Sequence, residues 1–203
     1  MMKVSKKKIF WGFMFLVLIV GGVICKIRWK VWFYNRPESS YVLTNEPQRV
    51  ILTFGNDGEL SRNVSWVCGG VSKQARLEYT KIGSGDTLLI DGSSRFLKTL
   101  GGFSYANWAK FKDLAYGNSY SYRVWNDDRA SGWYSFTMQP DSTDHFSFIF
   151  VGDVQDTLQG KTRGFMENVR YRFPQTDFYM LAGDFVERPM NCYWEEAYQS
   201  IGS

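Results

Sequence analysis

The sequence has few cysteines, a single histidine, and no acidic side chain in its first 36 residues. Three cysteines, Cys25, Cys68 and Cys192, are too few for a disulfide framework in a chain of 203 residues. Residues 1–36 hold eight lysines and arginines, which leaves 16 basic and 20 acidic side chains in the rest. The body is therefore mildly acidic and has no stripe of basic and aromatic residues. We expect no nucleic-acid partner.

The basic residues of this segment flank an uncharged run of 17 residues, Ile9 to Cys25. A helix of this length is about 25 Å long, just enough to cross a bilayer core when the flanking lysines reach the interface. Residues 1–36 are therefore predicted to be a single-pass membrane anchor, with the N-terminus inside and the body extracytoplasmic. A cleaved signal peptide is the alternative, disfavoured by the basic segment that follows. Lipidation of Cys25 is disfavoured because Val23-Ile24 precede it in place of small residues.

A polar linker, residues 37–47, leads to a segment with a different pattern, residues 48–140. Its apolar runs are short, rich in β-branched and aromatic residues, and separated by turn formers such as Asn126-Asp127-Asp128. Alternation of Tyr120, Tyr122 and Val124 with polar neighbours indicates one buried face. We predict an all-β antiparallel sandwich. The predicted strands are Gln48–Phe54, Asn63–Cys68, Ala75–Lys81, Phe103–Phe111, Ser119–Trp125 and Gly132–Met138.

The pattern changes again after Gln139-Pro140. Two nearly continuous apolar runs, residues 146–151 and 178–182, are each followed by a helical pattern, at residues 158–172 and 191–201. A buried strand, a helix, a second buried strand and a second helix form a βαβα unit, whose two strands should be parallel. Residues 141–203 are therefore predicted to be an α/β segment distinct from the sandwich.

Each of the two apolar runs is followed by Gly-Asp, so that Asp153 and Asp184 lie 31 residues apart. Ligands of parallel α/β sheets bind beyond the carboxyl ends of the strands, where the crossover should bring these two carboxylates side by side. Neighbouring carboxylates repel each other unless one is protonated or a cation lies between them. Glycine permits the sharp turn and the close backbone approach. We predict a site for hard divalent cations; an ordinary turn or helix cap is the alternative.

Residues 48–203 as a whole resemble the purple acid phosphatases and their calcineurin-like metallophosphoesterase relatives. The similarity lies in the runs Tyr105–Val124, Trp133–Thr137, Phe148–Gln155 and Ala182–Arg188. The resemblance implies a fibronectin-III-like N-terminal domain in residues 48–140 and the N-terminal part of the metallophosphoesterase domain in residues 141–203. It also implies hydrolysis of phosphate esters with two divalent metal ions, such as Fe, Zn or Mn.

The resemblance assigns roles to single residues. Asp153 becomes a ligand of the first metal, and Asp184 becomes the carboxylate that bridges both metals. Gln155 stands where many relatives have a histidine ligand, and Glu187 stands in place of the iron-binding tyrosine of the coloured enzymes. The run Gly183–Arg188 instead resembles a stretch of the Ser/Thr protein phosphatases, a similarity by which Glu187 would orient a catalytic histidine. Arg188 would bind phosphate as a bidentate fork, with a surface salt bridge as the alternative.

The further histidine motifs of the family are not found in this sequence. Its one histidine, His145, precedes the first strand of the α/β segment, where a surface role is expected. We therefore expect these residues to be the N-terminal part of a longer enzyme, inactive alone. The alternative is a non-catalytic surface module with a remnant metal motif. A weaker alternative is carbohydrate binding by the sandwich tryptophans, which are Trp66, Trp108, Trp125 and Trp133.

Overall fold

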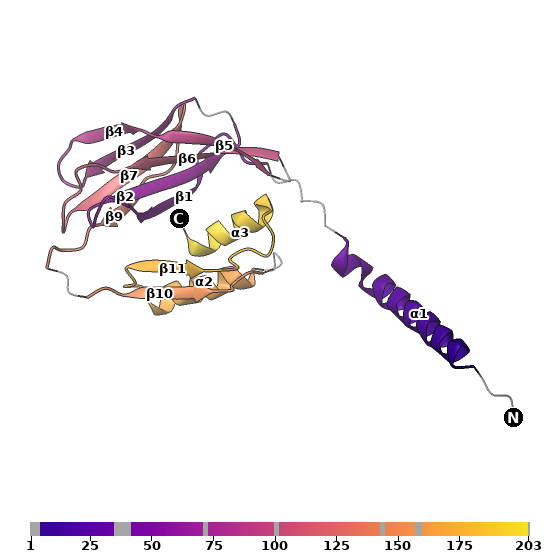
Figure 1. Cartoon of the computed structure of the whole chain (residues 1–203). Helices are drawn as coiled ribbons and strands as arrows, with labels where there is room; N and C mark the ends of the chain where they lie inside the picture. Colours follow the sequence, from indigo (N-terminus) through magenta and orange to yellow (C-terminus); the bar gives the residue numbers. More distant parts are fainter. Residues whose placement is uncertain are drawn as a thin grey trace. The chain divides into compact units, whose positions relative to one another are not determined.

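The computed structural model describes residues 5–34, 42–70, 73–99, 102–142, 145–156 and 160–202. The chain forms two compact units, Met1–Pro37 and Glu38–Ser203. The described part of the first unit is one long helix, and the second unit contains all the described strands (Figure 1).

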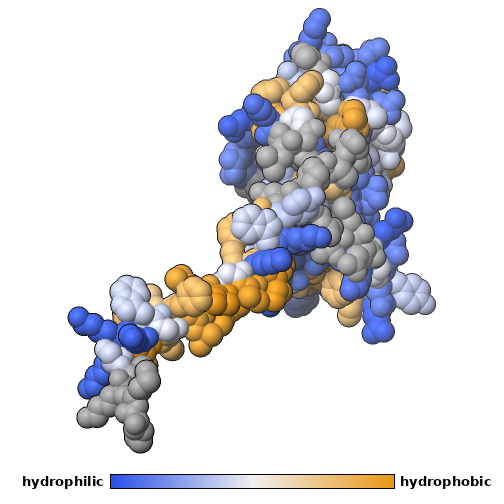
Figure 2. Space-filling model, turned by 90° about the vertical axis from the view of Figure 1, so that its right-hand side faces the viewer, coloured by the Kyte–Doolittle hydropathy of each residue, from blue (hydrophilic) through white to orange (hydrophobic). Residues whose placement is uncertain are grey.

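The helix of the first unit, α1, spans Lys6–Trp32. It has 27 residues, and none of them is buried. Its most apolar window has a mean hydropathy of 2.2, so the helix is long and apolar enough to cross a membrane. An almost continuous hydrophobic surface runs along it (Figure 2). A helix of this kind near the N-terminus fits a membrane anchor or a signal sequence.

Two antiparallel sheets form a β-sandwich in the second unit, as predicted. The strand order is β1-β2-β6-β5 in one sheet and β4-β3-β7-β8 in the other, where β9 also pairs with β7. The strands are β1 Gln48–Phe54, β2 Arg62–Cys68, β3 Ala75–Lys81, β4 Thr87–Asp91, β5 Ser93–Thr99, β6 Gly102–Lys110, β7 Ser119–Asn126, β8 Arg129–Ala130 and β9 Tyr134–Thr137.

Strands β4, β5 and β8 are missing from the sequence prediction. Only Gly92 separates β4 from β5, so the chain passes from one sheet to the other at a single residue. A Cβ at Gly92 would lie 2.8 Å from the carbonyl oxygen of Trp108, which is why this corner requires glycine. The described side chains of β5 are all exposed. The strand therefore lacks the alternation of buried and exposed residues that reveals the others.

The core lies between the two sheets, and β7 contributes to it as its alternation predicted. Tyr120, Tyr122 and Val124 are 3%, 4% and 0% exposed. Asn126, expected in a turn, is instead the last residue of β7 and is buried, where its amide donates to the carbonyl of Asn45 at 3.0 Å. The core residues are Val50, Val64, Trp66, Ala75, Leu77, Tyr79, Ala109, Phe111, Leu114, Tyr120, Tyr122, Val124 and Met138.

The remaining elements follow in the predicted strand–helix–strand–helix order. They are β10 Phe148–Gly152, α2 Lys161–Arg172, β11 Phe178–Ala182 and α3 Asn191–Ile201. The strands are parallel, with Gly152 opposite Ala182. β10 begins two residues later than predicted, and residues 157–159 of the predicted helix lie outside the described residues. Val151 of β10 and Met166 of α2 are buried.

Helix α3 contacts both α2 and β1, and in Figure 1 it lies between the sandwich and β11. Arg49 of β1 donates to a carboxylate oxygen of Glu195 at 3.1 Å and to the carbonyl of Asn191 at 2.8 Å. The ring of Phe54 meets that of Phe178 edge to face, with centroids 5.1 Å apart. The sandwich and the βαβα unit are therefore joined by polar and aromatic contacts within the second unit.

Candidate metal centre at two Gly-Asp turns

The carboxyl ends of β10 and β11 lie next to each other, and a Gly-Asp turn is found at each. Two backbone hydrogen bonds join the turns. The amide of Asp153 donates to the carbonyl of Gly183 at 3.4 Å, and the amide of Gln155 donates to the carbonyl of Asp184 at 3.0 Å. The structure thus brings Asp153, Gln155 and Asp184 to the same end of the parallel pair. Their roles as ligands remain a prediction.

The backbone of both turns adopts conformations that most residues avoid. A Cβ at Gly152 would lie 2.8 Å from the carbonyl oxygen of Ala182, so a side chain there would push the strands apart. The φ angles of Gly183, Asp153 and Asp184 are 66°, 52° and 35°. These values fall in the left-handed region, which aspartate enters more readily than most other residues. Such conformations are concentrated at functional sites.

The donor atoms at this end of the sheet suit one hard cation. Asp153, Gln155 and Asp184 are all exposed, so their oxygens are open to solvent. The Gln155 amide nitrogen donates to a carboxylate oxygen of Asp153 at 3.1 Å, which holds these two side chains together. Two carboxylates and an amide supply the oxygen ligands that Mn²⁺ or Mg²⁺ prefers. Among the described residues, no group of three or more His, Cys, Asp or Glu gathers around a metal position. These three side chains are too few for two cations.

Two further carboxylates near the turns accept hydrogen bonds from backbone amides at the start of α2. Asp156 accepts a hydrogen bond from the amide of Lys161 at 2.8 Å, and Glu196 accepts one from the amide of Gly160 at 2.7 Å. Both satisfy N–H groups that have no partner within the helix. Asp156 is not among the residues predicted from the sequence, although an aspartate just ahead of a helical pattern is a signal for such a cap. These contacts fix α2 and α3 beside the site.

Glu187 and Arg188 lie between the second turn and α3. Their side chains form an ion pair with each other, with an N–O distance of 4.0 Å, and both are about one-third exposed (33% and 34%). Within the described residues no polar contact joins either side chain to Asp153 or Asp184. A pair this long and exposed contributes little to stability, so Arg188 remains accessible to an anion. Its role in phosphate binding, like that of Glu187, is not established by this geometry.

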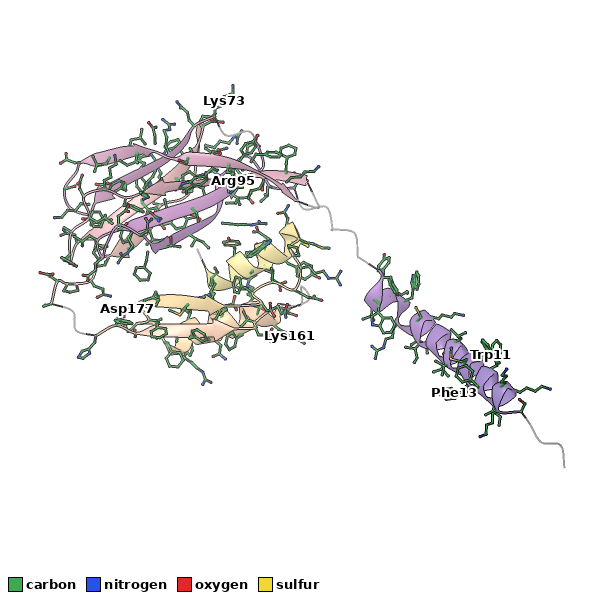
Figure 3. All side chains as sticks on the ribbon, viewed as in Figure 1. Trp11, Phe13, Lys73, Arg95, Lys161 and Asp177 are labelled. Carbon is green, nitrogen blue, oxygen red and sulfur yellow. The ribbon has the colours of Figure 1, made fainter. Side chains whose placement is uncertain are left out.

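His145 lies at the far end of the strand pair. It is exposed and precedes β10, whereas the Gly-Asp turns follow the strands. Lys161 and Asp177, labelled in Figure 3, mark the turn end and the opposite end of this small sheet. A strand of five residues, about 16 Å, separates His145 from the candidate site.

The four tryptophans that suggested carbohydrate binding do not share one surface. Trp66 is 1% exposed and belongs to the core. Trp108 lies on β6 in one sheet and Trp125 on β7 in the other. The guanidinium of Arg123 stacks on both Trp125 and Trp133, 4.6 Å from each ring centroid. The arrangement therefore offers no joint platform of these rings for a sugar.

The strand order and antiparallel pairing define the sandwich as a member of the fibronectin-III-like class. Residues 47–138 match the family model described as "Purple acid Phosphatase, N-terminal domain". These residues are similar to that domain, as the resemblance drawn from the sequence predicted. The matched residues end before β10 begins, so the match includes none of the candidate ligands.

Solved structures with a similar fold have low sequence identity to the chain. The third fibronectin III domain of the human KIAA0343 protein is 18% identical, with 55% of this chain and 94% of that chain covered and a TM-score of 0.32. A bromine derivative of BhCBM56 is 9% identical, with 51% and 95% covered and a TM-score of 0.29. The ectodomain of mouse nectin-like molecule 4 is 13% identical, with 46% and 34% covered and a TM-score of 0.28. Curated proteins gave no match.

Proposed function

We propose that this chain is the membrane-anchored N-terminal part of an acid-phosphatase-like metallophosphoesterase that hydrolyses phosphate esters with two divalent cations. The family match supports the phosphatase assignment through the sandwich alone. The observation that carries the proposal is the hydrogen bond from the amide of Gln155 to the carbonyl of Asp184, which joins the two Gly-Asp turns. This end of a parallel strand pair is where α/β proteins bind their ligands.

In the proposed site, Asp153 and Asp184 would hold divalent metal through their carboxylate oxygens, with Asp184 as the ligand shared by both ions, and Gln155 would add its amide oxygen. The bound metals, Fe, Zn or Mn, would supply the hydroxide and neutralise phosphate charge. Arg188 would hold a phosphate oxygen through its guanidinium, and Glu187 would orient a catalytic histidine. The ligand count sets a limit: the described residues suit one cation, so the second cation and the histidine need residues from elsewhere. We expect the chain alone to bind metal weakly and to hydrolyse nothing.

The anchor in this proposal is α1, with the N-terminus inside and the body extracytoplasmic. The helix has no buried residue, and its apolar surface is what a bilayer would cover. Alkaline carbonate extraction of membranes that contain the full chain tests the anchor, since an anchored chain stays in the pellet. Protease added to sealed vesicles tests the orientation of the body.

The metal site is tested by Mn²⁺ titration of the full chain in lipid nanodiscs, followed by electron paramagnetic resonance of the free ion. Asp153→Asn and Asp184→Asn should each weaken binding by about tenfold or more, because each removes a charged ligand. Asp86→Asn is the matched control, since this exposed aspartate lies in the sandwich after β3. Equal Mn²⁺ affinity in wild type and Asp184→Asn would remove Asp184 from the site.

A non-catalytic surface module is the second candidate function. The small ligand set favours it, because the described residues gather no three His, Cys, Asp or Glu around a metal. The same titration separates the two candidates. A module with a remnant motif predicts that wild type and both aspartate variants fail alike to bind Mn²⁺.

A further inference from the structure

Aromatic side chains gather on the β5–β6 hairpin, outside the sandwich core. Phe96 pairs with Tyr105 across the hairpin, and its ring centroid lies 5.6 Å from that of Tyr105 and 6.0 Å from that of Phe103. Phe96 and Phe103 are 53% and 54% exposed. Leu97, on the opposite face of β5, is 37% exposed. We call Phe96, Phe103 and Tyr105, which share one face of the hairpin, the hairpin patch.

Two cations lie next to the aromatic rings in β5: Lys98 on the same face as Phe96, and Arg95 on the opposite face. Arg95 and Lys98 are exposed residues of β5, and Figure 3 labels Arg95 on the sandwich. Neither takes part in the ion pairs found among the described residues. Exposed aromatic rings beside cations that lack an acidic partner are typical of protein surfaces that lie at a lipid headgroup region.

The chain enters the sandwich beside this hairpin. The amide of Gly69 donates to the carbonyl of Thr44 at 2.7 Å, and Leu43 is only 6% exposed, so this entry segment is fixed. Gly69 directly follows Cys68, which pairs with Tyr105. The entry segment and the hairpin patch therefore lie at the same end of the first sheet.

The tether to α1 is short. The helix ends at Trp32, and the entry segment is fixed by Leu43, 11 residues later. Eleven residues span at most about 40 Å when fully extended. If α1 crosses a bilayer, as proposed above, the patch end of the sandwich never leaves the vicinity of that bilayer. A tether of this length gives the patch an effective concentration in the millimolar range at that bilayer, so even a weak contact between the patch and the lipid surface becomes populated.

We propose that the hairpin patch docks on the surface of the membrane that α1 crosses. The aromatic rings enter the interface, and Lys98, on the same face, lies against anionic headgroups. This inference rests on the proposed anchoring. It names the lipid surface as the partner of β5, which lies at the edge of the first sheet. Docking holds the sandwich against the bilayer and limits the orientations of the whole second unit.

The test uses the full chain in nanodiscs at one copy per disc, with a phospholipid that carries a diazirine in its headgroup. After irradiation, mass spectrometry identifies the labelled peptides. We expect label on the ends of α1 and on residues 93–105. The variant Phe96→Ser/Phe103→Ser should lose the hairpin label and keep the α1 label. Phe165→Ser/Tyr171→Ser on α2 is the matched control, because these rings are 49% and 86% exposed and lie away from the hairpin.

Charge supplies a second measurement. In discs with anionic lipid, Lys98→Gln should lower the ratio of docked to undocked chain by about fivefold, and Arg95→Gln, on the opposite face of β5, is the control and should change it less. Label on α1 without label on the hairpin overturns the docking and leaves the anchor standing, whereas label on neither overturns the anchor. If the hairpin is protected from the lipid label only at two copies per disc, and cross-links form between hairpins, the patch binds a second copy of the chain. This result also overturns the proposal. Unchanged thermal unfolding of the serine variant verifies that the fold is retained.

Discussion

Replacing Arg49 with methionine should loosen α3 from the sandwich. The Arg49 side chain is 6% exposed and donates to Glu195, whose side chain is 22% exposed. It also donates to the carbonyl of Asn191, the first residue of α3. Methionine fills much of the same volume and donates no hydrogen bond. The substitution therefore removes the charge while the packing is largely kept.

The expected loss of stability follows from the burial of the pair. Breaking a buried ion pair by removing one partner costs about 3–5 kcal/mol, and an exposed pair contributes about 0–1 kcal/mol. Glu195 retains some contact with water and a hydrogen bond from Gln199 at 2.9 Å. We therefore expect Arg49→Met to lower the free energy of unfolding of the second unit by about 2 kcal/mol, about a thirtyfold change in the equilibrium constant.

Urea unfolding of the full chain in a nonionic detergent measures this change through tryptophan fluorescence. The matched control is Arg129→Met, whose ion pair with Glu46 has a longer N–O distance of 3.4 Å and side chains 51% and 63% exposed. The control should change the free energy of unfolding by less than about 0.5 kcal/mol. Equal, small losses in the two variants would refute the assignment of Arg49 as the link to α3.

Two further predictions concern the sandwich and the strand pair. The hydrogen bonds from Arg123 lower the pKa of Glu78 below its ordinary value of 4.5. The stability that this carboxylate contributes is therefore present above pH 4.5 and is lost as pH falls through the folded-state pKa. Glu78→Gln should cost about 1.5 kcal/mol at pH 7, a deficit that shrinks in urea titrations below pH 4.5. Gly152→Ala should lower the free energy of unfolding by about 1–3 kcal/mol and weaken Mn²⁺ binding, because the added Cβ meets the Ala182 carbonyl. Gly164→Ala is the control and should not destabilise α2, because the space around Gly164 is open.

The parts of the fold that the sequence predicted are those with a local pattern. Alternating apolar residues identified β7, and the two apolar runs ending on Gly-Asp identified β10 and β11 with their parallel order. Strand β5 escaped because its described side chains are all exposed. Asn126 was assigned to a turn by its residue type, whereas it is the last residue of β7 and its side-chain amide donates a hydrogen bond to the carbonyl of Asn45. Local patterns reveal burial on one face and do not reveal partners that are distant in sequence.

The contact between the sandwich and α3 could not be predicted from the sequence, because its partners are also distant along the chain. Arg49 lies in a strand pattern, and its partner Glu195 is 146 residues away. Arg49 has a positive φ of 53° and lies at an irregularity in the β1–β2 pairing. The amino-acid composition does not predict this irregularity. The proximity of the two turns could be predicted because a parallel crossover fixes it, and the single histidine of the sequence already indicated an incomplete set of metal ligands.

The Arg49 contact also gives the sandwich a role at the candidate site. Asp184 and Glu187 lie in the segment between β11 and α3. One end of that segment is fixed by the pairing of β11 with β10, and the other end begins α3 at Asn191, whose carbonyl Arg49 binds. Arg49 therefore fixes one end of the segment that contains Asp184, and ligand sets held in place bind cations more tightly than mobile ones. Arg49→Met should thus weaken Mn²⁺ binding although every ligand remains, and Arg129→Met should not. Unchanged Mn²⁺ affinity in Arg49→Met would show that Asp184 is positioned by the strand pair alone.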